Sequence, residues 1–174
     1  MQSAPPQTAS KSSFPAVADA RTRLLVLGSL PGEISLAHAQ YYAHPRNQFW
    51  RLMEAVIERP LAELAYAERL TTLLSARVGL WDVIASAERI GSLDTKIRNH
   101  RSNALAEFAA TLPNLRAIAF NGGKASNLGR RQLGPEPGYA LITLPSSSPA
   151  HAAVPFERKR MEWRALAGFV STDA

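Results

Sequence analysis

Short apolar runs, each ended by a loop of small and polar residues, alternate along this chain with stretches of helical periodicity. The runs have the length and composition of buried strands. The stretches between them repeat apolar residues every three or four positions, as a helix with one buried side does. Strands that alternate with helices pair in parallel, and the helices cover both faces of the sheet. The sequence therefore predicts an α/β fold with three layers, α/β/α, around a central, mainly parallel sheet.

Prolines and glycines divide this pattern into individual elements. Strands are expected at residues 24–27, 115–120 and 140–144, with a short strand or an extended segment at 78–84. Helices are expected at residues 47–59, 61–75, 103–112, 124–133 and 154–170. The N-terminal segment is rich in Ser, Ala, Pro and Gln, a composition typical of flexible tails. We therefore expect a flexible tail over residues 1–20 and a single domain over residues 21–174.

Three of the expected strands run into loops that suit a binding site. The loops read GSLPG after residue 27, NGGK after residue 120 and PSSSPAH after residue 144. In parallel sheets the carboxyl ends of the strands meet at one edge, where ligands bind. Neither glycine turn matches the two common phosphate-binding patterns, and no G-x-S-x-G elbow is present for a nucleophilic serine. Each loop alone is typical of a structural turn, so their convergence on one edge is what predicts a site.

The net charge of +6 is concentrated in one part of the chain. Between residues 89 and 131 there are eight Lys and Arg residues against two acidic residues, and the rest of the chain is balanced. Clustered positive charge indicates a polyanionic partner such as DNA or RNA. The alternative is an ordinary solvated surface.

Several classes of site are excluded by composition. Without cysteine the chain has no disulfide, thiolate nucleophile or cysteine-ligated metal. Its four histidines do not have metal-ligand spacing, so we expect neither a metal nor another cofactor. No apolar run is long enough to span a membrane and no secretory signal is present, which leads us to expect a cytoplasmic, nucleoid-associated protein.

The segment YYAHPRN at residues 41–47 carries aromatic and polar side chains just before a helical pattern. Tyr42 either packs in its loop or offers a flat face on which a base can stack. Asn47 either caps the following helix, a position that favours Asn, or faces a ligand. We interpret Asp82 as structural, and Asp94 as a helix cap with a role near the ligand as the alternative.

Taken in order, the motifs GSLPG, YYAHPRNQFW, GLWDV, GSLD, FNG and LPSSSPA resemble those of the hypoxanthine-DNA glycosylases. This family, also called the DNA-deoxyinosine glycosylases, belongs to the uracil-DNA glycosylase superfamily. The resemblance extends over residues 22–170 and implies a four-stranded parallel sheet between helices. It implies a monofunctional enzyme that flips a deaminated base, foremost hypoxanthine, out of DNA and hydrolyses its N-glycosidic bond. The implied partner is double-stranded DNA, with single-stranded DNA as an alternative, and the enzyme is expected to act as a monomer.

The resemblance also implies roles for individual residues. Asn47 and Asn121 would be catalytic, Asn47 by orienting a water toward C1′ and Asn121 by stabilising the departing base. The residues that bind the base would be Gly28, Ser29, Leu30, Pro31, Gly32, Tyr42 and His44. The loop that contacts the DNA backbone would comprise Pro145, Ser146, Ser147, Ser148, Pro149 and His151. No lysine is expected at the reacting carbon, so the abasic strand would be left uncut.

Two positions depart from the pattern of related uracil and thymine enzymes. Leu30 stands where a G-I-N-P-G motif has a water-holding Asn, and Leu144 stands where an HPSPLS motif has His. An aliphatic side chain cannot hold water, so the mechanism of those relatives does not transfer. Three alternatives stay open: a uracil-directed glycosylase, a DNA-binding module without catalysis, and an enzyme that acts on a free nucleotide.

Overall fold

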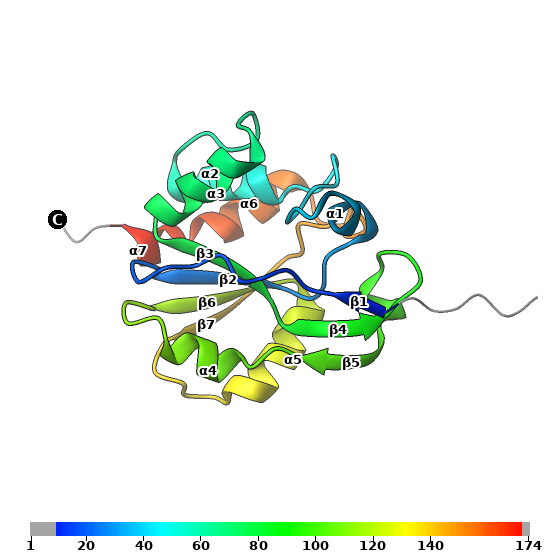
Figure 1. Cartoon of the computed structure of the whole chain (residues 1–174). Coiled ribbons are helices and arrows are strands. Elements are labelled where there is room, and N and C mark those ends of the chain that lie inside the picture. Colours follow the sequence, from blue (N-terminus) through cyan, green and yellow to red (C-terminus); the bar gives the residue numbers. More distant parts are fainter. Residues whose placement is uncertain (1–9, 172–174) are drawn as a thin grey trace, which may run out of the picture.

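The centre of the molecule is a sheet of four parallel strands, in the spatial order β3-β2-β6-β7 (Figure 1). The structure is a computed structural model, which describes residues 10–171. The strands are β2 (Leu24–Gly28), β3 (Val78–Asp82), β6 (Ala117–Asn121) and β7 (Ala140–Leu144). Every neighbouring pair in this sheet is parallel. The predicted fold class and the four-stranded parallel sheet are therefore confirmed.

Helices cover both faces of this sheet (Figure 1). One face carries α1 (Glu33–His38), α2 (Phe49–Ile57), α3 (Tyr66–Ser75), α6 (Phe156–Arg164) and α7 (Ala167–Val170). The other face carries α4 (Leu105–Ala110) and α5 (Gly123–Leu133).

The side chains of β2 alternate between two apolar cores. Leu24 and Val26 point to the face covered by α2, α3 and α6, whereas Leu25 and Leu27 point to the face covered by α4 and α5. All four are buried. A strand that is covered on both faces has no solvent-exposed side, so its sequence is an uninterrupted apolar run.

Several boundaries differ from those predicted. The helix expected at residues 61–75 begins only at Tyr66. The helix expected at residues 154–170 is divided into α6 and α7. The segment at residues 78–84 contributes to two strands, because β3 ends at Asp82 and β4 (Ile84–Glu88) begins two residues later.

A second, antiparallel sheet lies beside the central one and was not anticipated. It consists of β1 (Ser10–Ser12), β4 and β5 (Arg98–Ser102), in the order β1-β4-β5. β5 reads RNHRS and is exposed along its whole length. It therefore lacks the apolar alternation by which a strand is identified in a sequence.

Residues 10–20 belong to the folded structure, which corrects the expectation of a flexible tail up to residue 20. β1 pairs with β4. The ring of Phe14 packs edge-on against Tyr41 at 5.2 Å between centroids, and Val17 exchanges two backbone hydrogen bonds with Leu80, at 2.9 and 2.8 Å. These contacts satisfy backbone groups and partly bury the ring of Phe14, neither of which composition reveals. The remainder of the predicted tail, residues 1–9, lies outside the described residues.

Candidate functional site

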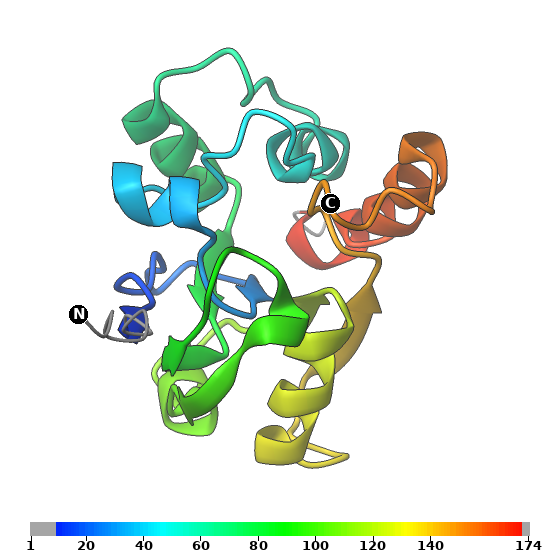
Figure 2. The same cartoon turned by 90° about the vertical axis from the view of Figure 1, so that its right-hand side faces the viewer.

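A cavity of about 660 Å³ opens at the carboxyl edge of the central sheet, the edge that faces the viewer in Figure 2. This volume lies within the range of roughly 300–1,000 Å³ that is usual for ligand sites. The loops after β2, β6 and β7 converge on it, as the alternation of strands and helices predicted. The 41–47 segment and the loop between β4 and β5 complete its walls.

Most of the residues that the sequence predicted for the site line this cavity. They are Gly28, Ser29, Leu30, Pro31, Gly32, Tyr42, His44, Asn47, Asn121, Ser146, Ser147, Ser148, Pro149 and His151. Pro145 is not among the lining residues. Its carbonyl accepts a hydrogen bond from the Trp163 indole at 2.9 Å, which fastens the start of its loop to α6.

Gly28 lies where no side chain can be accommodated. The parallel register sets it opposite Asp82 on β3. A Cβ atom added to Gly28 would lie 2.6 Å from Asp82 Oδ1 and 3.1 Å from the Tyr42 hydroxyl. The glycine is therefore required by close approach of the backbone to two polar side chains of the cavity.

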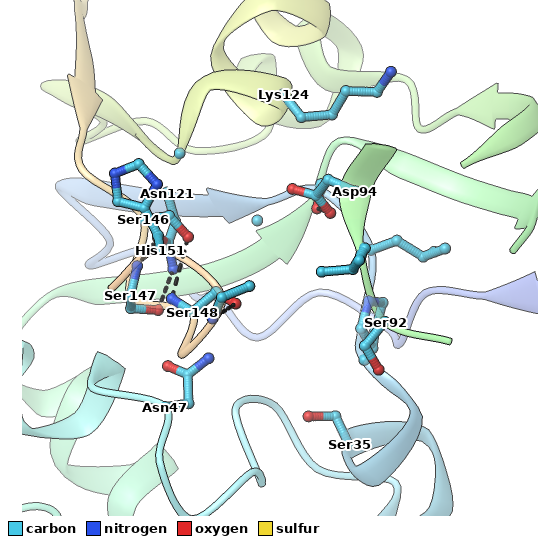
Figure 3. Close-up of a pocket in the computed structure, with 18 of the residues that line it drawn as sticks. Ser35, Asn47, Ser92, Asp94, Asn121, Lys124, Ser146, Ser147, Ser148 and His151 are labelled. Atoms are coloured by element: carbon cyan, nitrogen blue, oxygen red, sulfur yellow. Dashed lines mark hydrogen bonds between the residues drawn. The ribbon is translucent and has the colours of Figure 1, made fainter. Parts of the chain in front are cut away.

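Asn121 fastens the serine loop to the end of β6. Its Nδ2 donates to Ser147 Oγ and its Oδ1 accepts from the Ser147 backbone N–H, each at 2.9 Å (Figure 3). The side chain is buried. Because both ends of the amide are engaged, Asn121 acts in this structure as a clamp, and its catalytic role stays a prediction.

Asn47 occupies a position that fits both of its proposed roles. Its Oδ1 accepts the backbone N–H of Phe49, the first residue of α2, at 2.9 Å, so it supports the start of the helix, although the N-cap position itself is held by Gln48. The same side chain lines the cavity and points toward the loop of Ser147 and Ser148 (Figure 3). A carboxamide oxygen has a second lone pair. Capping therefore leaves Asn47 able to accept a hydrogen bond from a water in the cavity.

Tyr42 packs as a loop aromatic and also contributes to the cavity wall. Its ring stacks on Phe49, with 3.8 Å between centroids, and its backbone carbonyl accepts the Trp50 indole N–H at 3.0 Å. Its hydroxyl is buried without a hydrogen-bond partner among the described residues. Burial, followed by the charge of Asp82, raises the pKa of this phenol. Stacking of Tyr42 on a base stays a prediction.

His44 shapes the loop between the tyrosines and α2. Its Nδ1 accepts the backbone N–H of Arg46 at 3.0 Å. The imidazole also lines the cavity. The neighbouring Tyr41 is buried instead in the core, where its hydroxyl donates to the carbonyl of Pro15 at 3.0 Å.

Asp94 faces the cavity from the β4–β5 loop. It begins the short 3₁₀ helix η1 (Asp94–Lys96), but η1 has no side-chain cap hydrogen bond. Its Oδ1 accepts the hydroxyl of Ser29 at 2.6 Å. The structure places Asp94 in the cavity wall and gives it no capping hydrogen bond, and its role near the ligand stays a prediction.

Asp82 is the residue that sequence reasoning missed. It was interpreted as structural, yet it lines the cavity, is only 3% exposed, and its Oδ2 has no hydrogen-bond partner among the described residues. Burial, followed by the negative charge of Asp94, raises the pKa of Asp82 to about 7, and the positive charge of Arg89 partly opposes this. The available signal was its place at the end of a buried parallel strand, the criterion that identified the other loops.

Arg89 is a second buried residue that was not predicted. Its guanidinium donates to the carbonyls of Pro31 and Gly91, so it joins the GSLPG loop to the β4–β5 loop. Its Nη1 has no partner among the described residues. Burial lowers the pKa of this guanidinium, and the charge of Asp94 opposes the shift.

Lys124, at the start of α5, also lines the cavity, as the last residue of the NGGK loop that was expected at this edge. In Figure 3 its side chain extends away from Asn47 and Asn121. Between residues 10 and 171, no group of three or more His, Cys, Asp and Glu side chains is arranged to hold a metal ion. The same part of the chain has no helix long and apolar enough to cross a bilayer.

Comparison with known proteins places this fold and cavity in a family. The family model of the uracil DNA glycosylase superfamily matches residues 14–168. A hypoxanthine DNA glycosylase of Methanosarcina acetivorans is 42% identical over 156 residues, which are 90% of this chain and 97% of that protein. One from Methanosarcina barkeri is 43% identical over 115 residues, 66% of this chain and 73% of that protein. A solution NMR structure of a protein from M. acetivorans, named as a candidate uracil DNA glycosylase, is 39% identical with a TM-score of 0.81, and the match covers 92% of this chain and 99% of that one.

The buried carboxyl of Asp82 predicts a specific pH dependence of stability. The pKa of an Asp carboxyl in water, as in the unfolded chain, is 3.8, and the pKa of Asp82 in the folded protein is about 7. The folded protein therefore binds more protons than the unfolded chain between those values, and stability falls as the pH rises through this window. Asp82→Asn should remove the dependence and raise the free energy of unfolding at pH 8 by as much as about 4 kcal/mol.

Denaturant unfolding at pH 5 and pH 8 measures this effect. Asp19→Asn is the matched control, because hydrogen bonding to Arg21 lowers the pKa of the Asp19 carboxyl and its substitution should bring no gain at pH 8. Equal pH dependence in the wild type and Asp82→Asn would show that Asp82 is not a desolvated carboxyl.

Proposed function

Because the chain belongs to the uracil-DNA glycosylase superfamily, we propose that it is a DNA glycosylase that hydrolyses the N-glycosidic bond of an extruded, deaminated base. The preferred base is hypoxanthine, and the product is an abasic site. The observation that carries the proposal is the 42% identity to a hypoxanthine DNA glycosylase over 90% of the chain. The superfamily match over residues 14–168 includes every residue that lines the cavity.

The surroundings of the cavity support a DNA substrate. Lys96, Arg98 and Arg101 lie on the β4–β5 hairpin beside the cavity, and Lys124 lies in its wall. Basic side chains at these places can contact phosphates on both sides of an extruded nucleotide. The proposed partner is double-stranded DNA with a deaminated base, bound by a monomer at the nucleoid.

The proposed reaction needs a bound base, a positioned water and stabilisation of negative charge on the leaving group. Backbone N–H groups of Ser29, Leu30 and Gly32 stabilise the charge that develops on the base. Asn47 accepts a hydrogen bond from the attacking water and directs it toward C1′. Because an amide does not titrate, Asn47 positions the water without removing its proton. Asn121 fixes the serine loop through Ser147, and that loop presents hydroxyls to the DNA backbone.

A uracil-directed glycosylase is the second candidate, because the solved structure with a TM-score of 0.81 is named as a candidate for that activity. Leu30 argues against it, since this buried side chain replaces the water-holding Asn of uracil and thymine enzymes. The two candidates differ in the base that is released fastest from otherwise identical DNA.

Base preference separates these candidates. One duplex sequence carrying deoxyinosine, deoxyuridine, deoxyxanthosine or mismatched thymidine is incubated with excess enzyme, and abasic sites are revealed by alkali. Deoxyinosine should react faster than deoxyuridine by at least about tenfold, the scale on which a shaped pocket discriminates. Faster reaction of deoxyuridine would favour the second candidate. Activity on free inosine with indifference to the duplex would favour a nucleotide enzyme.

Substitution separates the two roles of Asn47. Asn47→Ala should slow single-turnover base release by about 100-fold or more, the effect of a misplaced reactant, while binding of deoxyinosine DNA is retained. Asn47→Asp is the matched control for the helix cap, because Asp is an equally good cap. A residue that only caps α2 would instead make Asn47→Ala less stable by about 1 kcal/mol with full activity per folded molecule.

A further inference from the structure

The floor of the cavity holds an acid that the proposed mechanism has not used. Asp82 is buried and lines the cavity, and its Oδ2 has no hydrogen-bond partner among the described residues. The hydroxyl of Tyr42 lines the same cavity and is likewise unpartnered. A buried carboxyl without a partner destabilises a fold. Its location in the cavity therefore indicates that a ligand supplies the missing partner.

The groups around Asp82 favour its neutral, protonated form. Gly28 packs against Oδ1 of Asp82, Oδ2 has no hydrogen-bond partner among the described residues, and Asp94 contributes a like charge from the β4–β5 loop. The positive charge of Arg89 acts in the other direction, but its guanidinium donates to backbone carbonyls. Burial and Asp94 prevail, so the pKa of Asp82 is raised to about 7. A neutral carboxyl has an O–H that can donate to a bound base.

We propose that Asp82 is a further catalytic residue, the general acid that protonates N7 of the departing purine. This inference rests on the proposed glycosylase function. N7 is a basic ring nitrogen of a purine that stays free while N9 is bonded to the sugar. A proton on N7 draws electrons from the glycosidic bond, so that less negative charge develops on the departing base for the backbone N–H groups to stabilise. In this mechanism Asn47 positions the attacking water, and Asp82 assists the departure of the base.

The step is balanced in atoms and electrons. The C1′–N9 bond breaks and its electron pair goes to the base, while the proton of Asp82 is transferred to N7. The oxygen of water bonds to C1′. The proton that this water loses passes through solvent to the Asp82 carboxylate and restores its neutral form. The net reaction consumes one water and yields the free base and an abasic sugar, with no further reactant.

The test compares deoxyinosine with 7-deaza-2′-deoxyinosine, in which carbon replaces N7. Asp82→Asn should slow single-turnover release of hypoxanthine by about 100-fold, the usual contribution of a general acid. It should also abolish the decline in the wild-type rate above pH 7 that loss of the Asp82 proton causes. Replacing N7 by carbon should slow base release by a larger factor in the wild type than in Asp82→Asn, because only the wild type protonates N7. Asp19→Asn is the control with an unchanged rate.

Two results would overturn the inference: an unchanged rate and pH profile in Asp82→Asn, or an equal loss in both proteins when N7 is replaced. A slower rate in Asp82→Asn cannot be explained by unfolding, because this variant is expected to be more stable than the wild type at pH 8. If the wild type releases no base from deoxyinosine DNA, the proposed function itself fails. Release by the wild type with no effect of Asp82→Asn would overturn the role of Asp82 alone.

A separate observation concerns the rim of the cavity, where large apolar side chains are exposed. Ile90 is 67% exposed and Leu93 is 49% exposed, and both lie in the loop between β4 and β5. Leu93 and the partly exposed Ile34 line the cavity. Exposed apolar side chains gathered beside a binding site indicate contact with a partner. The fourth large exposed apolar side chain of the described residues, Met161, lies on α6.

The loop that carries Ile90 and Leu93 is fixed at its base. The carbonyl of Gly91 accepts hydrogen bonds from Lys11 Nζ and Arg89 Nε, each at 2.8 Å. The hydroxyl of Ser92 accepts the backbone N–H of Glu33 at 2.9 Å. These bonds tie the loop to β1 and to α1, so its two apolar side chains are displayed by an ordered support.

The opposite rim offers no large aliphatic side chain as a wedge. The serine loop at residues 145–151 contains Pro, Ser, Ala and His and no large aliphatic residue. Its hydroxyls suit phosphate contacts, as predicted. They cannot fill the gap that an extruded nucleotide leaves in a base stack, a role for which proteins use apolar side chains.

We infer that Ile90 and Leu93 enter the DNA duplex beside the extruded nucleotide and keep the stack open. The partner is duplex DNA, because the hairpin continues into Lys96, Arg98 and Arg101, whose charges complement the phosphates. Extrusion of a base costs unstacking energy, which the inserted side chains offset. The DNA thus meets an apolar rim on the β4–β5 side and a hydroxyl-rich rim on the β7 side.

Fluorescence of 2-aminopurine placed next to deoxyinosine tests this inference, because it rises when the neighbouring base is unstacked. The wild type and Met161→Ala should raise the fluorescence equally. The double variant Ile90→Ala, Leu93→Ala should bind the duplex but lose most of the rise. Its rate of base release should fall by about tenfold or more, since unstacking one step costs a few kcal/mol. A full rise in fluorescence with the double variant would overturn the inference. Because the fluorescence does not depend on bond cleavage, this outcome can be distinguished from failure of the glycosylase activity.

Discussion

The parallel register between β2 and its neighbours is the constraint on which the site depends. It sets Gly28 opposite Asp82 and ends β6 beside them at Asn121. The missing side chain of Gly28 lets the carboxyl of Asp82 and the hydroxyl of Tyr42 meet the end of β2. A one-residue change in register would turn these side chains to the opposite face of the sheet. The cavity is therefore a consequence of strand pairing, and the loops only complete it.

Polar cross-links between loops make this edge rigid enough for chemistry. Asn121 holds the serine loop, Arg89 joins the GSLPG loop to the β4–β5 loop, and Ser29 binds Asp94 across the same gap. In contrast, Asp82 and the hydroxyl of Tyr42 are left unpartnered among the described residues. Such groups reduce stability, and proteins keep them where function requires them. Residues with satisfied hydrogen bonds thus surround polar groups that lack a hydrogen-bond partner. We regard this contrast as the physical signature of the site.

The sequence was sufficient for the central fold because its strands are buried on both faces. The continuous apolar run at residues 24–27 and the strand at 117–121 were found in nearly their true positions. β1 and β5 were missed because they are short, polar and largely exposed, and their pairing depends on neighbours distant in the chain. For the same reason the segment around Phe14 was taken for tail, although its ring packs on Tyr41.

The position of the site could be predicted, but the state of its side chains could not. Strand ends place Gly28 and Asn121 at one edge whatever the loops do. Whether a carboxyl there is paired depends on contacts across the fold, so Asp82 was taken as structural, and Asp94 was taken for a cap although it binds Ser29. The two roles of Asn47 were both visible in the sequence. The structure adds that they are compatible, because the cap uses one lone pair of Oδ1.

The claim that this cavity releases a base from DNA is tested most directly by counting both products of one reaction. A duplex with a single deoxyinosine is incubated with the protein, free hypoxanthine is quantified by chromatography, and the strand is examined before and after alkali. The account predicts one free base for each abasic site, with the strand intact until alkali is added. Salt-sensitive binding of the duplex with neither free base nor abasic site would contradict it and would leave a DNA-binding module without catalysis.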